Sequence, residues 1–205
     1  MSEAKLPKRI RNHVNPLADT QEYHFGGFSN NLPIIVDIGA YRGEFTQKLV
    51  DHFAETRNYI VTEIRKPYAA YLRDLFSDNK QVRVFAGDSV RNLKNLLQPS
   101  IEKGVTIEYI FFNFPDPWFK EKHKKRRVVS QRMLDDIGQW LPSQTKLVFQ
   151  TDQLSLFEET KELLSENGFT FNEFKDPLWG IRSYWEEMKI GEGDQIYRLY
   201  FTNKI

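Results

Sequence analysis

The chain contains no cysteine among its 205 residues, which excludes disulfides and cysteine-based zinc sites and fits a reducing compartment. It also lacks long hydrophobic runs: the longest have the length of a β-strand, so none predicts a transmembrane helix. The first residues are polar and basic with no apolar segment behind them, and they do not form a secretory signal. From these absences we expect a cytoplasmic protein that does not contact membranes.

An excess of charge of one sign is absent as well. The 29 Lys and Arg residues are balanced by 28 Asp and Glu residues, so net charge alone indicates no class of partner. The four histidines are scattered without metal-ligand spacing, and no nucleophile, base and orienting acid form a recognisable set. We therefore expect no metal site. No segment indicates an obligatory protein partner, so we expect a monomer or a homodimer.

Hydrophobic residues make up 40% of the chain, enough for the core of one domain. From Pro33 onward, short apolar runs alternate with stretches of helical period, such as Phe45, Leu49 and Phe53. The runs predict strands at residues 34–36, 59–61, 82–85, 107–114, 146–149, 169–174 and 196–201. This alternation predicts an α/β fold with a mostly parallel sheet and helices on both faces. We expect a domain over residues 31–205, preceded by a basic arm over residues 1–30.

Acidic residues follow four consecutive predicted strands, at Asp37, Glu63, Asp88 and Asp116. Ligands of parallel sheets bind at the carboxyl ends of the strands, so these acids are expected to face one ligand. Glu63 is placed to accept from the hydroxyls of a ribose, and Asp88 from an adenine amino group. One such acid can instead be a helix N-cap, and Asp88 fits that alternative.

The glycines after the first strand do not match a dinucleotide site. The fingerprint G-x-G-x-x-G starting at Gly39 requires glycine at positions 41 and 44, where the sequence has Tyr41 and Glu44. A phosphate-binding P-loop is also absent, so an NAD-dependent dehydrogenase is disfavoured. S-adenosyl-L-methionine combines a ribose and an adenine with a sulfonium cation that carboxylates attract. It is the cofactor that this set of acids predicts.

A basic run follows the fourth strand. Six of the eight residues from Lys120 to Arg127 are Lys or Arg, and clustered cations match a phosphate backbone. A solvated loop or a nuclear-localisation-like patch remains the alternative. The cations near the N-terminus either extend this surface or form a separate tail; they are Lys5, Lys8, Arg9 and Arg11, with His13 beside them.

Two further segments lie near the C-terminal strands. Asp152 ends the fifth strand and could cap the next helix. The segment from Ser183 to Glu186 is expected to be a loop before the last strand.

The segment Phe114-Pro115-Asp116-Pro117-Trp118, with Lys120 and the basic residues after it, is the most specific motif in the chain. Together with Asp37-Ile38-Gly39, Glu63-Ile64, Thr151-Asp152 and the Ser183/Glu186 pair, it resembles bacterial tRNA (guanine-N7)-methyltransferases from about Arg9 to the C-terminus. The segment from Arg11 to Leu17 also resembles an N-terminal motif found in part of that family. The resemblance implies a Rossmann-like class I methyltransferase fold with a seven-stranded sheet, and tRNA as the partner.

The resemblance also implies roles for individual residues. Asp116 is the expected catalytic residue, at the reacting end of the cofactor. The expected cofactor-binding residues are Asp37, Gly39, Glu63, Ile64, Asp88, Ser89, Asn113 and Asp116. The expected substrate-binding residues are Lys120, Asp152, Ser183 and Glu186. The expected RNA-binding residues are Lys122, Lys124, Lys125, Arg126 and Arg127.

The chain departs from the family pattern in three places. Tyr41 stands where many members have glycine, Ser183 where threonine is usual, and Trp185 where Phe or Tyr is usual. None of these changes removes a carboxylate, so we expect activity. The alternatives are a methyltransferase for another nucleobase atom, and a catalytically degenerate RNA-binding protein, which only Tyr41 favours.

Overall fold

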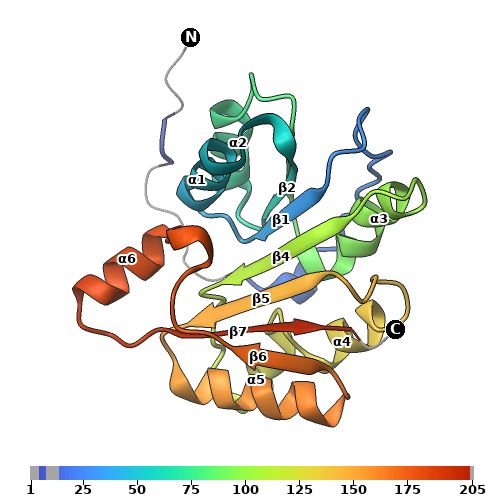
Figure 1. Ribbon diagram of the computed structural model, residues 1–205. Helices are drawn as coiled ribbons and strands as arrows, with labels where there is room; N and C mark the ends of the chain where they lie inside the picture. The colour runs from blue at the N-terminus through green and yellow to red at the C-terminus, as the bar shows by residue number, and fades with distance from the viewer. Residues whose placement is uncertain (1–4, 8–13, 204–205) are drawn as a thin grey trace. The chain divides into compact units, whose positions relative to one another are not determined.

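The structure, a computed structural model, describes residues 5–7 and 14–203. Seven strands form one sheet in the order β3-β2-β1-β4-β5-β7-β6 (Figure 1). The prediction of a mostly parallel α/β sheet with seven strands is confirmed. By its internal contacts the chain divides into two compact units, unit 1 over residues 1–106 and unit 2 over residues 107–205.

Unit 1 carries three parallel strands and the helices that connect them. Its elements are η1 (Pro16–Ala18), β1 (Ile34–Ile38), α1 (Glu44–Phe53), η2 (Ala54–Thr56), β2 (Asn58–Glu63), α2 (Lys66–Leu75), β3 (Val82–Ala86) and α3 (Ser89–Ile101). Strand β2 lies between β1 and β3 and pairs in parallel with both. Every residue of β1 and β2 is buried, as expected for strands of a parallel sheet.

The turn from β1 to α1 depends on Gly43. This residue caps the helix with φ 81°, in the left-handed region that glycine adopts without strain. A Cβ atom at this position would lie 2.6 Å from Leu72 Cδ2, so glycine also permits close packing of α1 on α2. Helix α2 has Pro67 in its first turn, where the fixed φ of proline suits the start of a helix.

Unit 2 carries the remaining strands, and β7 runs antiparallel to both of its neighbours. Its elements are β4 (Ile107–Asn113), η3 (Glu121–Arg126), α4 (Gln131–Ile137), β5 (Lys146–Thr151), α5 (Leu154–Glu166), β6 (Thr170–Glu173), η4 (Leu178–Gly180), α6 (Tyr184–Gly191) and β7 (Tyr197–Thr202). Phe201 of β7 is fully buried, with its ring 6.5 Å from that of Phe112 and 5.9 Å from that of Phe169.

Two segments differ from the sequence-based expectation. The segment that begins at Ser183 is not a loop, because Ser183 caps helix α6. The basic run is not an open loop either, since its residues from Glu121 to Arg126 form the 3-10 helix η3. Neither segment has the regular apolar spacing that identified the other helices.

The described part of the expected N-terminal arm packs within unit 1. Phe28 is buried, and the Phe25 ring lies 5.5 Å from that of Phe85 on β3. The basic residues Lys8, Arg9, Arg11 and His13, and the start of the N-terminal motif, lie outside the described residues. No helix among the described residues is long and apolar enough to span a membrane.

We expect Phe201→Ala to lower the free energy of unfolding by roughly 3–5 kcal/mol, because removal of the ring would leave a cavity in a closely packed core. Urea unfolding measures the change. Tyr200→Ala, at the next and half-buried position on the same strand, is the matched control and should lose less than half as much. Equal losses would contradict the packing described for unit 2.

Candidate active site

The carboxyl ends of the strands in unit 1 are tied together through Thr62. Its carbonyl oxygen accepts from Gly39 N at 2.8 Å and Ala40 N at 3.1 Å. Its hydroxyl lies 2.7 Å from the Ser89 hydroxyl oxygen. These bonds bring the loops after β1, β2 and β3 to one edge of the sheet. Six of the expected cofactor-binding residues lie at this edge: Asp37, Gly39, Glu63, Ile64, Asp88 and Ser89.

Asp37 is a buried carboxylate within β1. Its Oδ2 accepts from the Thr46 hydroxyl at 2.6 Å. Burial raises the pKa of Asp37 from 3.8 to about 6, the Thr46 hydrogen bond partly offsets this rise, and the charge of Glu63 adds to it. Asp37 is therefore a carboxylate whose charge is costly in the free protein, and a cation bound nearby would favour its ionised form.

Glu63 is also buried, and both of its carboxylate oxygens accept hydrogen bonds from the chain itself. Arg65 donates from Nε to Oε1 at 2.8 Å and from Nη2 to Oε2 at 2.7 Å. The backbone N–H groups of Arg65 and Tyr41 donate one bond each, at 2.9 and 3.0 Å. A ribose hydroxyl at Glu63 would have to replace one of these donors, so Arg65 controls access to this carboxylate.

Tyr41 has φ 55°, a conformation that glycine adopts more readily than tyrosine. This geometry explains why glycine suits the position in the family pattern. The Arg65 guanidinium lies 5.1 Å from the centre of the Tyr41 ring and 4.7 Å from that of Tyr68. The tyrosine therefore packs over the arginine that holds Glu63.

Asp88 is the N-cap of α3, as its alternative reading predicted, and its Oδ1 accepts from Val90 N at 3.0 Å. The carboxylate is buried. Capping uses one oxygen and fixes the direction of the side chain, which is compatible with a second role toward a ligand.

In unit 2 the loop after β4 holds Asp116 between two strained residues. Phe114 has φ 50° and Trp118 has φ 43°, and such conformations persist only where the surroundings enforce them. Phe114 N donates to Gln150 O at 2.9 Å, and the Arg126 guanidinium lies 5.0 Å from the Trp118 ring centre. Asp116 itself is half-buried.

Asn113, at the end of β4, fits a ligand-binding role. Its amide Nδ2 and Oδ1 are both buried without a hydrogen-bond partner among the described residues. Buried amides are rarely left unsatisfied in folded proteins, so a polar ligand at this strand end would satisfy it.

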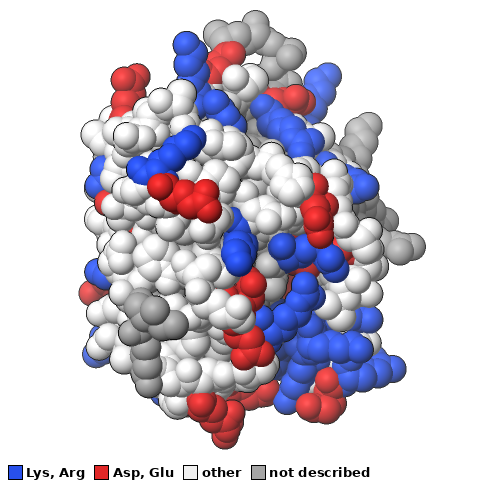
Figure 2. Space-filling view, turned by 90° about the vertical axis from the view of Figure 1, so that its right-hand side faces the viewer, with Lys and Arg blue, Asp and Glu red and all other residues white. Residues whose placement is uncertain are grey.

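The basic run on η3 divides into paired and exposed cations. Arg127 is mostly buried and donates to Pro117 O at 2.8 Å and to Glu159 at 2.7 Å. Lys124 Nζ also contacts Glu159, at 3.0 Å. These two residues fasten the Asp116 loop to α5, whereas Lys122 and Lys125 are exposed. On the face of the molecule drawn in Figure 2, Lys and Arg side chains gather in one area with few acidic groups among them.

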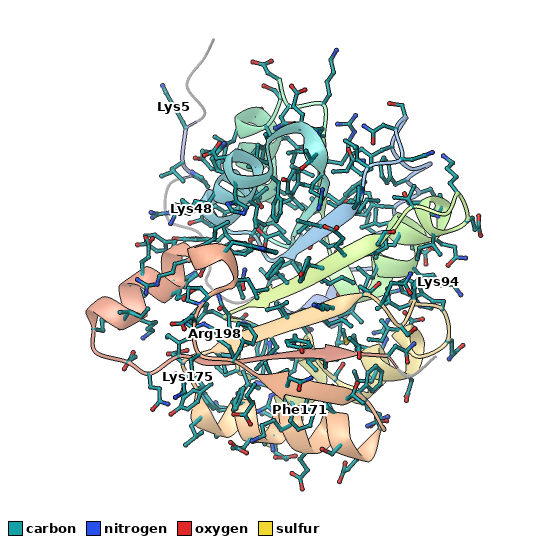
Figure 3. All side chains as sticks on the ribbon, viewed as in Figure 1. Lys5, Lys48, Lys94, Phe171, Lys175 and Arg198 are labelled. Atoms are coloured by element: carbon teal, nitrogen blue, oxygen red, sulfur yellow. The ribbon has the colours of Figure 1, made fainter. Side chains whose placement is uncertain are left out.

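Helix α6 and its N-cap carry two of the four expected substrate-binding residues, Glu186 and Ser183. Ser183 Oγ accepts from Glu186 N at 3.2 Å at its N-terminus. The Glu186 carboxylate is fully buried and accepts from Arg198 Nη2 at 2.5 Å and from Gln150 Nε2 at 3.3 Å. Arg198 also donates to Lys175 O at 2.6 Å, and Figure 3 shows these two residues close together near α6.

Asp152 contacts the same helix, with its Oδ2 3.5 Å from Lys189 Nζ. It does not cap α5: Gln153 occupies the N-cap, and Thr151 Oγ1 accepts from Gln153 N at 3.1 Å. The hydrogen bonds that Lys189 donates to Glu192 and Asp194 raise its pKa, and the charge of Asp152 adds to this effect. The cation is therefore held close to Asp152.

The structure thus brings together two sets of predicted residues, one at the strand ends of unit 1 and one around α6 and the Asp116 loop of unit 2. The predicted site residues did not include Arg65, Gln150 and Arg198, which donate hydrogen bonds to the buried carboxylates. Of the features that were not predicted, only the start of helix α6 could have been predicted from the sequence, because Ser183 and Glu186 have the spacing of a helix capping box.

The sheet order defines the Rossmann-like fold of class I methyltransferases, and solved structures support this fold. A precorrin-6y C5,15-methyltransferase from Geobacter metallireducens matches with a TM-score of 0.55 at 14% identity, over 85% of this chain and 80% of that one. A SAM-dependent methyltransferase from Aquifex aeolicus matches with a TM-score of 0.52 at 10% identity, over 86% and 84%. At these identities the likeness establishes the fold.

The family follows from sequence comparison. A family model described as "Putative methyltransferase" matches residues 31–184. The tRNA (guanine-N(7)-)-methyltransferase of Listeria innocua is 33% identical over 84% of this chain and 81% of its own length. The Synechococcus protein of that name is 30% identical over 97% and 87%, and the Thermosynechococcus vestitus protein 27% identical over 98% of both chains. The chain belongs to the tRNA (guanine-N7)-methyltransferase family.

We expect Asp37→Asn to stabilise the ligand-free protein at pH 8 by up to about 3 kcal/mol, the cost of the raised pKa. Between pH 4 and pH 6 the folded wild type binds more protons than the unfolded chain, so its stability falls as the pH rises through 6. Asparagine keeps the Thr46 hydrogen bond and has no charge to bury. The gain should therefore shrink toward pH 5.

Thermal unfolding at pH 5 and pH 8 tests this expectation. Asp51→Asn, at an exposed position of α1, removes the same charge and should change little at either pH. A Tm for Asp37→Asn that lies below the wild-type value at pH 8 would contradict the argument.

Proposed function

We propose that this protein transfers the methyl group of S-adenosyl-L-methionine to N7 of a guanosine in the variable loop of tRNA. The observation that carries the proposal is the similarity to tRNA (guanine-N(7)-)-methyltransferases over nearly the whole chain. The buried acids at the strand ends support the cofactor. When bound, S-adenosyl-L-methionine supplies an electrophilic methyl group on a sulfonium centre.

Unit 1 would hold the nucleoside part of the cofactor. Glu63 would accept from the ribose hydroxyls and Asp88 from the adenine amino group, while Gly39, Ile64 and Ser89 line the same strand ends. Asp37 would lie near the cationic end of the cofactor, because a nearby cation would offset the cost of ionising its buried carboxylate. Asn113, whose buried amide has no hydrogen-bond partner among the described residues, and Asp116 are the other two residues that we assign to the cofactor.

The chemistry requires little proton transfer. Guanine N7 has a lone pair and no proton, so no general base is needed, and positioning with exclusion of water would supply most of the catalysis. The base gains positive charge during the reaction, and a fixed carboxylate at Asp116 would stabilise it. Its loop is suited to this role because the flanking prolines and strained residues restrict its backbone.

Substrate selection would rest on unit 2. Asp152 or Glu186 would accept from guanine N1–H and the amino group, which adenine cannot match. Arg198 and Gln150 hold Glu186 in one orientation, and Ser183 begins the helix that carries it. Lys120 would complete this set.

The tRNA backbone would lie along the basic run. The exposed Lys122 and Lys125 are best placed for phosphate contacts, with Arg126 beside them, whereas Lys124 and Arg127 form ion pairs with Glu159.

We place the enzyme in the cytoplasm with tRNA, as a monomer or homodimer. We assign residues 31–205 to the catalytic domain and residues 1–30 to an N-terminal arm.

The test is transfer of labelled methyl from S-adenosyl-L-methionine to an unmodified tRNA transcript, followed by nucleoside analysis. We expect 7-methylguanosine from the variable loop. Methylation at another nucleobase atom would keep the fold and cofactor but reject the proposed product. Binding of tRNA without any methylation would indicate the degenerate RNA-binding protein that Tyr41 suggests.

We expect Asp116→Ala to lower kcat by at least about a hundredfold, since it removes the charge that stabilises the transition state. Its Kd for tRNA should stay within about threefold of wild type, because the basic run is untouched. Asp135→Ala, at an exposed position of α4, serves as the control. Near-wild-type turnover of Asp116→Ala would show that another group stabilises the charge.

A further inference from the structure

Residues 19–28, which we call the N-terminal strap, run along β3 and α3 in unit 1. Tyr23 donates its hydroxyl hydrogen to Ala86 O and its backbone N–H to Asn92 Oδ1, the latter at 2.7 Å. The Tyr23 ring packs edge-on against Phe85, and Lys103 Nζ donates to Gly26 O at 2.8 Å. The strap is thus attached at several points that lie far from it in sequence.

Part of this arrangement has a simple structural reason. Strand β3 stands at the end of the sheet order, and natural proteins cover such edge strands to prevent pairing with other chains. The contacts of Tyr23 and Phe25 with Phe85 serve this purpose. They do not account for Asp19, whose contacts lie beyond the end of the strand.

Asp19 binds the loop that carries the adenine-site acid. Its Oδ2 accepts from Asp88 N at 2.7 Å. Gly87, the preceding residue, has φ 148°, and a Cβ atom there would lie 2.7 Å from the same Asp19 oxygen. The loop therefore combines a conformation that favours glycine with an approach so close that a Cβ atom would displace the Asp19 carboxylate.

Asn92 binds the backbone carbonyl of Asp88. Its Nδ2 donates to Asp88 O at 2.9 Å and to Gln21 O of the strap at 2.9 Å. The N–H of Asp88 is thus bound by the strap directly, and its carbonyl through Asn92. Because Asp88 Oδ1 also caps α3, the direction of this carboxylate follows from the position of its backbone.

We infer that Asp19 is a positioning residue for the cofactor: it holds the backbone of Asp88 so that the Asp88 carboxylate meets the adenine amino group. This inference rests on the proposed function, because it takes Asp88 as the adenine-binding acid. Asp19 does not touch the cofactor. It acts through a hydrogen bond to a carboxylate, which is stronger than one between neutral groups.

The test is calorimetric binding of two probes to the full-length protein, S-adenosylhomocysteine and its inosine analogue, in which a carbonyl oxygen replaces the adenine amino group. The wild type should bind the adenine compound more tightly. In Asp19→Asn we expect the Kd for S-adenosylhomocysteine to rise about tenfold and the Kd for the inosine analogue to rise much less. The preference for adenine therefore falls.

Glu22→Gln is the matched control, since Glu22 lies in the same strap, is exposed and loses the same charge. It should leave both Kd values and their ratio unchanged. Should Asp19→Asn fail to fold, Tyr23→Phe provides the second variant. It removes the hydroxyl bond to Ala86 O, two residues before Asp88, and should shift the ratio in the same direction by a smaller amount.

The possible outcomes separate the two levels of the argument. Equal weakening of both probes, together with a lower Tm, would give Asp19 a purely structural role and overturn the inference. Unchanged binding by Asp19→Asn would overturn it as well, while leaving the proposed function intact. A wild-type protein that binds neither probe would overturn the proposed function and this inference with it.

Discussion

The parallel register of β1, β2 and β3 is the constraint on which the proposed cofactor site depends. It aligns Ile38 with Thr62 and Glu63 with Ala86, so residues far apart in the chain meet at one edge of the sheet. The bonds from Gly39 and Ala40 to the Thr62 carbonyl then fix the loop after β1. Without that register the acids would be isolated groups, each with only its local role.

Burying several carboxylates in one protein requires partners, and the structure supplies them in different ways. Glu63 and Glu186 each face an arginine, Arg65 and Arg198 respectively, so their charges are paired. Asp37 has only a hydroxyl partner in the described structure, and its pKa rises to about 6. A cationic ligand nearby would therefore stabilise the ionised form of Asp37, which has no arginine partner in the described structure.

In unit 2, one residue of β5 makes several of the contacts that hold the candidate site. Gln150 connects three features: it pairs with Asn113 in the sheet, accepts from Phe114 N, and donates to Glu186. The loop that holds Asp116 and the helix that holds Glu186 are therefore joined through one residue of β5. Arg127 performs a similar task between that loop and α5. These contacts restrain the Asp116 loop and helix α6 in fixed positions.

The sequence by itself determined the positions of the strands along the chain, the acids at their ends and the proline-framed Asp116 loop. Hydrophobic periodicity and turn-forming residues are properties of neighbouring residues, so a sequence reveals them directly. It also contained the capping-box spacing of Ser183 and Glu186, although the short helix behind it lacks a regular apolar face. Only the tertiary structure decided which side chains partner the carboxylates and which cations stay exposed. Arg198 reaches Glu186 and Asp19 reaches Asp88 across many residues of chain, and such pairings depend on how elements pack, which no local pattern encodes.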